Sequence, residues 1–165
     1  MRSINMDEAL AVILKTFEKA AEMEAYALAA CVLDNGGRVK AFLKQDGASI
    51  MRFEIARGKA FGALSLHRTS RMVLAKAREK PAFMDTLREM ADSPIFLEAG
   101  GQIIRDANGD VIGAIGVTGD VNEVDDMCAI EGIRRAGLRS DDDFTAEEMK
   151  RLNIKPNPVL KDPRT

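Results

Sequence analysis

Apolar residues recur at helical spacing near the start of the chain. Asn5 followed three residues later by Glu8 has the form of a capping box, a common start of a helix. The apolar positions that follow share one helix face: Leu10, Ile13, Leu14, Phe17 and Ala21. The pattern predicts an amphipathic helix from about Met6 to Glu24.

Short apolar runs between turn signals predict five strands. The turn Asp34-Asn-Gly-Gly37 joins the first two, because its glycines allow the positive φ angles of a tight hairpin. The expected strands cover residues 26–33, 38–44, 95–97, 102–105 and 111–118. Helical periodicity returns from Ile50 to Leu64 and in two shorter segments that meet at Pro81. A last large helix is expected from Val121 to about Gly137.

This order of elements predicts an α+β fold. Two hairpin signals imply antiparallel pairing, so we expect one five-stranded antiparallel sheet with flanking helices, similar to the profilin-like and PAS-like topology. We expect a single domain over residues 1–138. The remainder, residues 139–165, is predicted to be a C-terminal extension or arm, because it turns polar and carries three of the five prolines.

Composition excludes several classes of protein. With 46% hydrophobic and 30% charged residues the chain is not a disordered tail, and its formal net charge of -2 argues against nucleic acid as a partner. No apolar run approaches the roughly 20 residues of a membrane-spanning helix. The first residues are too polar for a signal peptide, so we expect a cytoplasmic protein without a membrane partner.

The single histidine, His67, follows an apolar helical segment. A histidine in the last turn of a helix is favoured by the helix dipole, and a role as haem or metal ligand is the alternative. No His-rich or Cys-rich spacing supplies a zinc site, so we expect no metal centre. Cys31 and Cys128 fall in apolar segments, where cysteine is usually a small buried hydrophobe.

Arg57 is the first candidate for an anion site. It falls inside the apolar stripe of its helix, where a charge must pair or meet a ligand, and Glu54 lies one turn earlier. Two interpretations stay open: an ion pair with Glu54, or binding of an anionic ligand. Lys59 is expected on the opposite, solvated face.

Glycines near the end of the last strand offer a second candidate. The run Gly113-Ala-Ile-Gly116 lies inside a strand pattern, where glycine usually marks the close approach of another element. At Thr118-Gly119 the backbone N–H groups of a helix start could bind an anion, or Asp120 could cap them instead.

Several segments resemble a known family. The run from Ile104 to Asp120, followed by Asp125-Asp-Met-Cys-Ala129, is similar to the GlcG/HbpS-like family, also met as the C-terminal domain of PduO-type proteins. Further matching positions are Val32–Gly37, Phe42, Asp46-Gly47, Ala56, Lys59-Ala60, Ser70-Arg71, Gly100-Gly101 and Gly132. The resemblance covers about residues 8–138.

The resemblance implies a five-stranded antiparallel sheet and homo-oligomers, from dimers to octamers. It also implies haem as a candidate cofactor, because some members bind haem, with ligands that differ between members. We therefore expect a small-ligand-binding protein, with haem or another tetrapyrrole as the best-known candidate ligand. The expected ligand contacts are Phe53, Arg57, Gly100, Gly101, Thr118 and Gly119, with His67 as candidate haem ligand. The alternatives are an enzyme or accessory protein acting on a small carboxylate or aromatic metabolite, and a structural assembly subunit.

Overall fold

The structure, a computed structural model, describes residues 1–165. Its helices are α1 (Met6–Glu22), α2 (Arg52–Leu66), α3 (Ser70–Glu79), α4 (Pro81–Met90), α5 (Asn122–Arg135), α6 (Ala146–Leu152) and the short 3-10 helix η1 (Asp141–Asp143). Its strands are β1 (Ala29–Asp34), β2 (Val39–Lys44), β3 (Gly101–Arg105) and β4 (Val111–Thr118). No helix combines the length and the apolar character that spanning a membrane requires.

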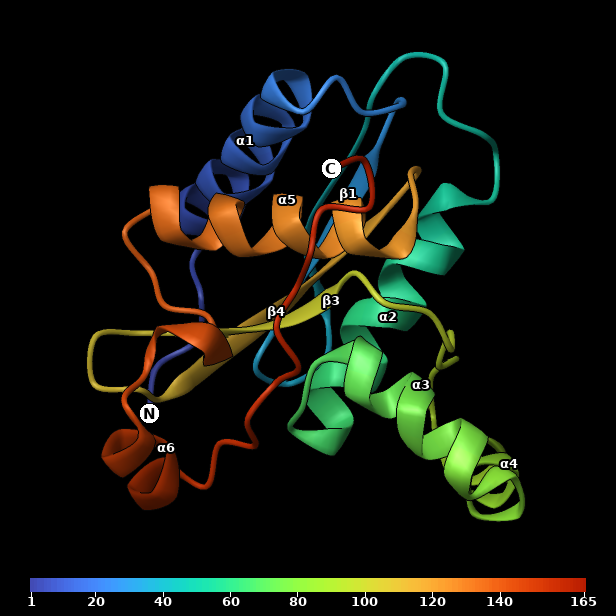
Figure 1. Ribbon diagram of the computed structural model, residues 1–165, viewed down its shortest axis with the longest axis vertical. Coiled ribbons are helices and arrows are strands. Elements are labelled where there is room, and N and C mark those ends of the chain that lie inside the picture. Colours follow the sequence, from blue (N-terminus) through green and yellow to red (C-terminus); the bar gives the residue numbers. More distant parts are fainter.

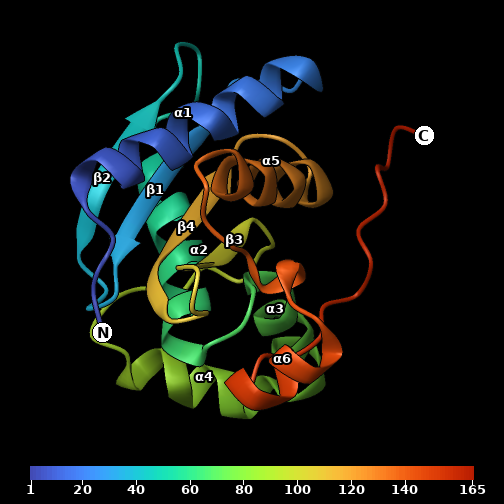
Figure 2. The same ribbon diagram turned by 90° about the vertical axis from the view of Figure 1, so that its left-hand side faces the viewer.

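The four strands form one antiparallel sheet in the order β2-β1-β4-β3. Helices α1 and α5 lie side by side over one face of this sheet, and α2 covers the other face (Figures 1 and 2). Each face has its own apolar core, and α3 and α4 add a third, smaller cluster beyond α2. The α+β class is therefore confirmed.

The prediction of a fifth strand is wrong. Residues 95–97 form no strand, although Ile95 is buried. The segment follows Pro94 and packs against α2, where Gly58 and Gly62 leave room for it. Its backbone therefore lies beside a helix, and Glu98 N–H closes a turn on the carbonyl of Phe96 instead of pairing with a strand.

Local signals in the sequence place most element ends correctly. Asn5 and Glu8 form the expected capping box, and α1 ends at Glu22, two residues earlier than expected. A second capping box at Thr145 begins α6. The predicted start of α2 is wrong at Ile50, which lies before the helix and is exposed.

Glycine allows the close packing of α2 on the sheet, as the sequence predicted. A Cβ atom at Gly116 would overlap the carbonyl oxygen of Ala56 in α2. On the other face, a Cβ at Gly132 would overlap the hydroxyl of Thr16, so α5 and α1 also touch through a glycine.

The segment after α5 begins with packed structure and ends as an arm. Arg105 in β3 forms a buried ion pair with Asp141, with 2.6 Å between Nε and Oδ1. Phe144 and Ile154 are also buried. From residue 154 the chain has no helix or strand, and Figure 1 shows it running back across the molecule. The domain boundary at residue 138 stays a prediction.

Candidate functional site

The expected ligand contacts fall into three separate places. Phe53 and Arg57 lie in the first half of α2. Gly100 and Gly101 adjoin a buried polar cluster, and Thr118 and Gly119 lie at the end of β4 next to it. His67 lies beyond the last turn of α2, next to a hollow on the surface. The structure therefore does not bring these residues together into one site.

Arg57 has no ion-pair partner in the structure. Its side chain is half-buried, and neither Glu54 nor any other group forms an ion pair or a hydrogen bond with it. Of the two open interpretations, the ion pair with Glu54 is therefore wrong; Glu54 is exposed to solvent and forms no ion pair. Phe53 packs edge-on against Phe42 of β2, with 4.9 Å between ring centroids. A ligand-binding role for Phe53 and Arg57 stays a prediction.

Lys59 is the main correction to the sequence analysis. The expected solvated lysine is 2% exposed, and its Nζ lies 3.1 Å from Oδ2 of Asp125 and 3.0 Å from the carbonyl oxygen of Val117. Helix α2 is enclosed on more than one side, by the sheet and by the segment leading into β3. A helical wheel that assumes one buried face therefore misplaces this residue.

The glycines before β3 adjoin this cluster. Gly100 N–H donates to Oδ1 of Asp126 over 3.0 Å, and Gly101 N–H donates to Oγ of Ser70 over 2.7 Å. Protein groups thus occupy the N–H donors of both glycines, which were among the expected ligand contacts. Gly100 has a φ of 112°, a left-handed conformation that suits glycine.

The junction after β4 is partly occupied by protein groups. Thr118 accepts a hydrogen bond of 2.8 Å from Nη1 of Arg52, so Arg52 and not Arg57 reaches this end of the sheet. Asp120 accepts from the N–H of Val121, and its own N–H donates to Oδ1 of Asp125. Asp120 therefore binds the N–H of Val121, just before α5, but no side chain caps the first turn of that helix, so the capping role expected of Asp120 is not formed.

A second buried carboxylate, Asp126, follows directly on α5. Its Oδ1 accepts from Gly100 N–H and, over 2.7 Å, from Nε2 of Gln102. Its Oδ2 lies 3.3 Å from Nη1 of Arg71, but the two are not aligned for a hydrogen bond. The cluster therefore contains two cations and two buried acids that hold α2, α3 and α5 together.

Burial changes the acidity of both aspartates. Loss of solvent raises the pKa of Asp125 to about 6, although Lys59 and the N–H of Asp120 partly oppose the shift. Burial also raises the pKa of Asp126, and the charge of Arg71 opposes it. These carboxyl groups can therefore hold a proton nearer to neutral pH than an exposed aspartate does.

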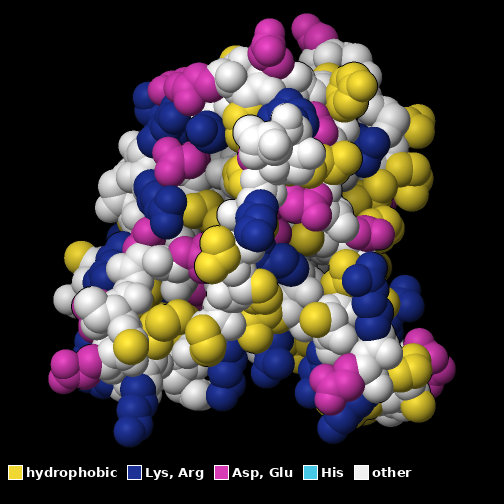
Figure 3. All heavy atoms as spheres, in the orientation of Figure 1, with side chains coloured by type: hydrophobic (Ala, Val, Ile, Leu, Met, Phe, Trp, Pro, Cys, Tyr) yellow, Lys and Arg dark blue, Asp and Glu magenta, His cyan; other side chains and the backbone are white.

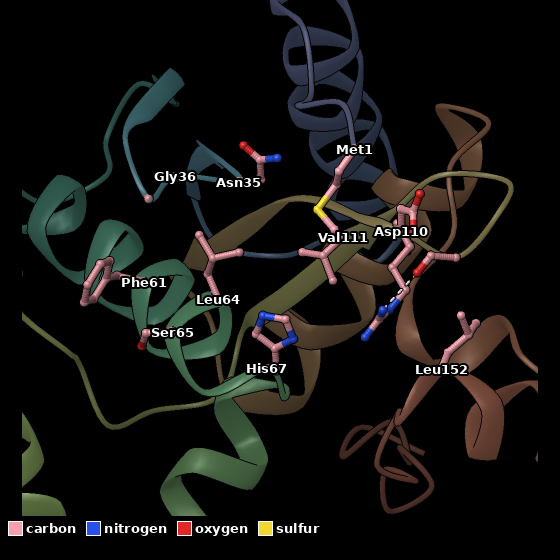
Figure 4. A pocket seen from close by; sticks show the side chains of 13 residues that line it. Met1, Asn35, Gly36, Phe61, Leu64, Ser65, His67, Asp110, Val111 and Leu152 are labelled. Atoms are coloured by element: carbon pink, nitrogen blue, oxygen red, sulfur yellow. Dashed lines mark hydrogen bonds between the residues drawn. The ribbon is translucent and has the colours of Figure 1, made fainter.

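His67 borders an open hollow of about 510 Å³ between α2, β4 and α6. The residue is the C-cap of α2, with a left-handed φ of 48°, so the prediction that it ends a helix is confirmed. Figure 4 shows its imidazole among side chains from these three elements. The apolar lining is Met1, Phe61, Leu64, Val111 and Leu152. A histidine beside an apolar hollow of this size can hold a flat ligand through a metal.

The two cysteines lie on opposite faces of the sheet. Cys31 belongs to the core under α2, and Cys128 to the core under α1 and α5. Burial raises the pKa of each thiol to about 12. Both are therefore buried hydrophobes, as predicted, and neither is a reactive thiolate at neutral pH.

Sequence reasoning missed the functional potential of Arg71, Asp125 and Asp126. The sequence held one signal of a buried carboxylate. Asp126 precedes Ile130 and Ile133 by four and seven residues, and this spacing places it on the apolar face of α5. A carboxylate on a buried helix face needs a partner. The partners, from α2, α3 and the β3 strand, could not be identified without the fold.

Comparison with known proteins identifies the relatives of this chain. The family model described as "Haem degrading protein HbpS-like" matches residues 4–134. None of the curated proteins is similar enough to count as a match.

Three solved structures share the fold at low sequence identity. Klebsiella pneumoniae protein ORFY has a TM-score of 0.73 and 24% identity, over 83% of this chain and 92% of that one. A double mutant of HbpS from Streptomyces reticuli has a TM-score of 0.70 and 22% identity, over 81% and 87%. The PduOC:haem complex has a TM-score of 0.71 and 18% identity, over 82% and 96%.

These likenesses show the fold, and the family model, which matches well over half of the sequence, shows the family. The resemblance seen in the sequence is confirmed: the chain belongs to the HbpS-like family.

Proposed function

We propose that this protein binds haem in the hollow beside His67, with the imidazole as the ligand of the iron. The observation that carries the proposal is the position of the only histidine at an apolar hollow of about 510 Å³. The family is described as haem degrading, and one solved neighbour is a haem complex, which supports haem as the ligand to test first.

The lining of the hollow suits a macrocycle. Phe61 and Leu64 come from α2, Val111 from β4 and Leu152 from α6, so apolar side chains line the hollow from three elements. A volume of about 510 Å³ falls within the 300–1,000 Å³ typical of small-molecule and cofactor sites. The donor set also fits, since neutral imidazole is a common protein ligand of haem iron.

The polar groups of the hollow indicate how haem would lie. Arg105 also lines it, but its guanidinium is already bound to Asp141 and to the carbonyl oxygen of Gly109. The carboxylates of a haem would therefore point towards solvent, where they need no partner. His67 is itself exposed, which favours weak, reversible binding through a replaceable ligand.

When bound, haem would supply an iron centre for electron transfer or for chemistry with oxygen. The residues of this chain would hold the ring and present one nitrogen to the iron. The alternative of an enzyme acting on a small carboxylate receives less support from the geometry. Gly100 and Gly101 have their N–H groups occupied, and Arg57 lies apart from them.

We also propose that the protein forms homo-oligomers. Four exposed apolar residues lie at the same end of the sheet: Tyr26, Ile50, Met51 and Val121. Figure 3 shows hydrophobic side chains gathered at the upper right, over the loop that leads into α2. A second copy of the chain would bury this surface, and a patch of this kind often marks an interaction site. Light scattering that gives a monomer at micromolar concentration would contradict self-association.

A cytoplasmic location is part of the same proposal. It is supported by two free cysteines, which are the normal state in a reducing compartment.

The test of haem binding uses a substitution that the backbone tolerates. His67→Gly removes the imidazole and suits the left-handed φ of 48°, so the fold should stay intact. Haem titrated into wild type should give a saturable Soret band, which should shift or disappear in His67→Gly and return when imidazole is added. Glu24→Gly, at another exposed residue with a left-handed φ of 52°, is the matched control and should behave like wild type. An identical spectrum in wild type and His67→Gly would remove His67 as the ligand.

A further inference from the structure

A smaller hollow of about 210 Å³ lies between α3 and α5, away from His67. Its lining includes Arg71 and Arg78 from α3, Asn122, Glu123 and Asp126 from α5, and Leu160 from the C-terminal arm. In Figures 1 and 2 the chain beyond α6 runs back along the side of the molecule that carries α3 and α5. The arm therefore covers this hollow through Leu160.

Buried polar atoms at this hollow have no hydrogen-bond partner. All three guanidinium nitrogens of Arg71 are buried and make no hydrogen bond, and the same is true of Oδ2 of Asp126. The side chain of Asp126 is fully buried. Nη1 of Arg71 and Oδ2 of Asp126 form an ion pair at 3.3 Å without hydrogen-bond alignment, while Nε and Nη2 of Arg71 have no partner of any kind. Buried polar groups in proteins are nearly always hydrogen-bonded, so these atoms indicate a missing polar molecule that bridges or extends the pair.

Positive and negative side chains lie on opposite sides of the hollow. Arg71 and Arg78 supply positive charge from α3, and Asp126 and Glu123 supply negative charge from α5. A guanidinium binds a carboxylate through two parallel N–H donors, and a carboxylate binds an ammonium group. A molecule that carries both charges would complement both sides at once, whereas a simple anion would meet the repulsion of two acids.

The volume limits the size of that molecule. The hollow of about 210 Å³ is smaller than the roughly 300–1,000 Å³ of typical small-molecule and cofactor sites, so it admits only a small metabolite. A tetrapyrrole is far too large. Leu74 and Leu160 add an apolar wall against which a short side chain can pack.

We propose that the hollow between α3 and α5 binds a small zwitterionic α-amino acid, whose carboxylate pairs with Arg71 and whose ammonium group pairs with Asp126. Arg78 and Glu123 add long-range attraction of matching sign at the same site. This site is separate from the haem proposal and does not depend on it.

Access to the site requires only a movement of the arm. Asn157 holds the arm by two side-chain hydrogen bonds, to Thr69 and Asp142, and Val159 is exposed. Nearer the end of the arm, the guanidinium of Arg164 donates to the carbonyl oxygen of Met23. These ties are polar and lie at or near the surface, so a ligand can enter when the arm moves, without opening the core.

The test is a titration of the full-length protein with alanine, followed by ¹H–¹⁵N NMR at constant ionic strength. We expect saturable shifts of the Nε–H of Arg71 and of the amides of Asn122 and Glu123, with His67 unaffected. Lactate, which lacks the cation, propionate and ethylamine should each bind about tenfold or more weakly than alanine. Lactate binding as tightly as alanine would overturn the assignment of a zwitterion.

Variants decide whether these two residues hold the ligand. Arg71→Lys keeps the positive charge beside Asp126 but loses the bidentate guanidinium. Asp126→Asn removes the negative charge with little change of shape. Each should weaken alanine binding about tenfold or more. Arg88→Met, an exposed arginine of α4 outside the hollow, is the matched control and should bind as wild type does. Absence of saturable binding in wild type would show that water alone fills the hollow, and equal affinity in the variants would overturn the site.

Discussion

The substitution Lys59→Met tests whether the buried cluster stabilises the fold as the structure indicates. Methionine fills much of the space of the lysine stem but leaves Asp125 without the cation 3.1 Å away. Breaking a buried pair in this way typically costs about 3–5 kcal/mol, because a charge is left buried without compensation.

The pKa of Asp125 independently predicts how the free energy of unfolding depends on pH. Folding raises this pKa from 3.8 to about 6, so the stability that the group contributes is complete below pH 4 and is lost as pH rises through 6. Wild type therefore loses about 3 kcal/mol of stability through this group as pH rises from below 4 to above 6. Lys59 lowers this pKa, so without Lys59 the pKa of Asp125 rises further and the variant continues to lose stability above pH 6, where wild type levels off. Lys59→Met should therefore cost more free energy of unfolding at pH 8 than at pH 5.

Urea unfolding followed by circular dichroism at pH 5 and pH 8 measures this difference. The control is Lys150→Met, an exposed lysine of α6 without an ion pair, which should change the free energy of unfolding by no more than about 0.5 kcal/mol. A loss below about 1 kcal/mol at pH 8, or an equal loss at both pH values, would refute the reasoning about Lys59 and Asp125.

Three further predictions concern other parts of the fold. Arg57→Met should change the free energy of unfolding by less than about 0.5 kcal/mol in a urea titration, because Arg57 has no ion pair to lose; a loss above about 2 kcal/mol would reveal a partner. Gly116→Ala should cost about 3 kcal/mol or prevent folding, since its Cβ would overlap α2, whereas Gly36→Ala, at an exposed turn, should melt within a few degrees of wild type. Ile50→Glu should lower the oligomeric mass in light scattering, and Leu14→Glu, on the exposed face of α1, should not; equal masses for both variants would exclude the proposed surface.

Much of the fold could be predicted because its signals are local. Asn5 and Thr145 begin helices through capping boxes that involve residues three positions away, and Gly37 closes a hairpin with a positive φ of 79°. Such contacts depend on neighbours in the sequence. The hairpin signals and the family resemblance both implied an antiparallel sheet of five strands, of which the structure has four.

The buried cluster could not be predicted because its partners are distant in the chain. Lys59 meets Asp125 across 66 residues, and Asp126 meets Gly100 across 26. A helical wheel of α2 assumes a single buried face, so it placed Lys59 in solvent and drew attention to Arg57. Only the tertiary packing shows that α2 is enclosed, and that Arg52 reaches Thr118.

The haem proposal is tested most directly on the imidazole itself. His67 is the only histidine, so protein labelled with ¹⁵N-histidine gives one set of ring signals. Zinc protoporphyrin, a diamagnetic analogue of haem, should move these signals strongly upfield at one equivalent, because the ring lies over the porphyrin when a nitrogen binds the metal. The signals of Phe61 and Leu64 should shift in the same titration, since both line the hollow. Ring signals of His67 that stay unchanged while the porphyrin binds would contradict the account.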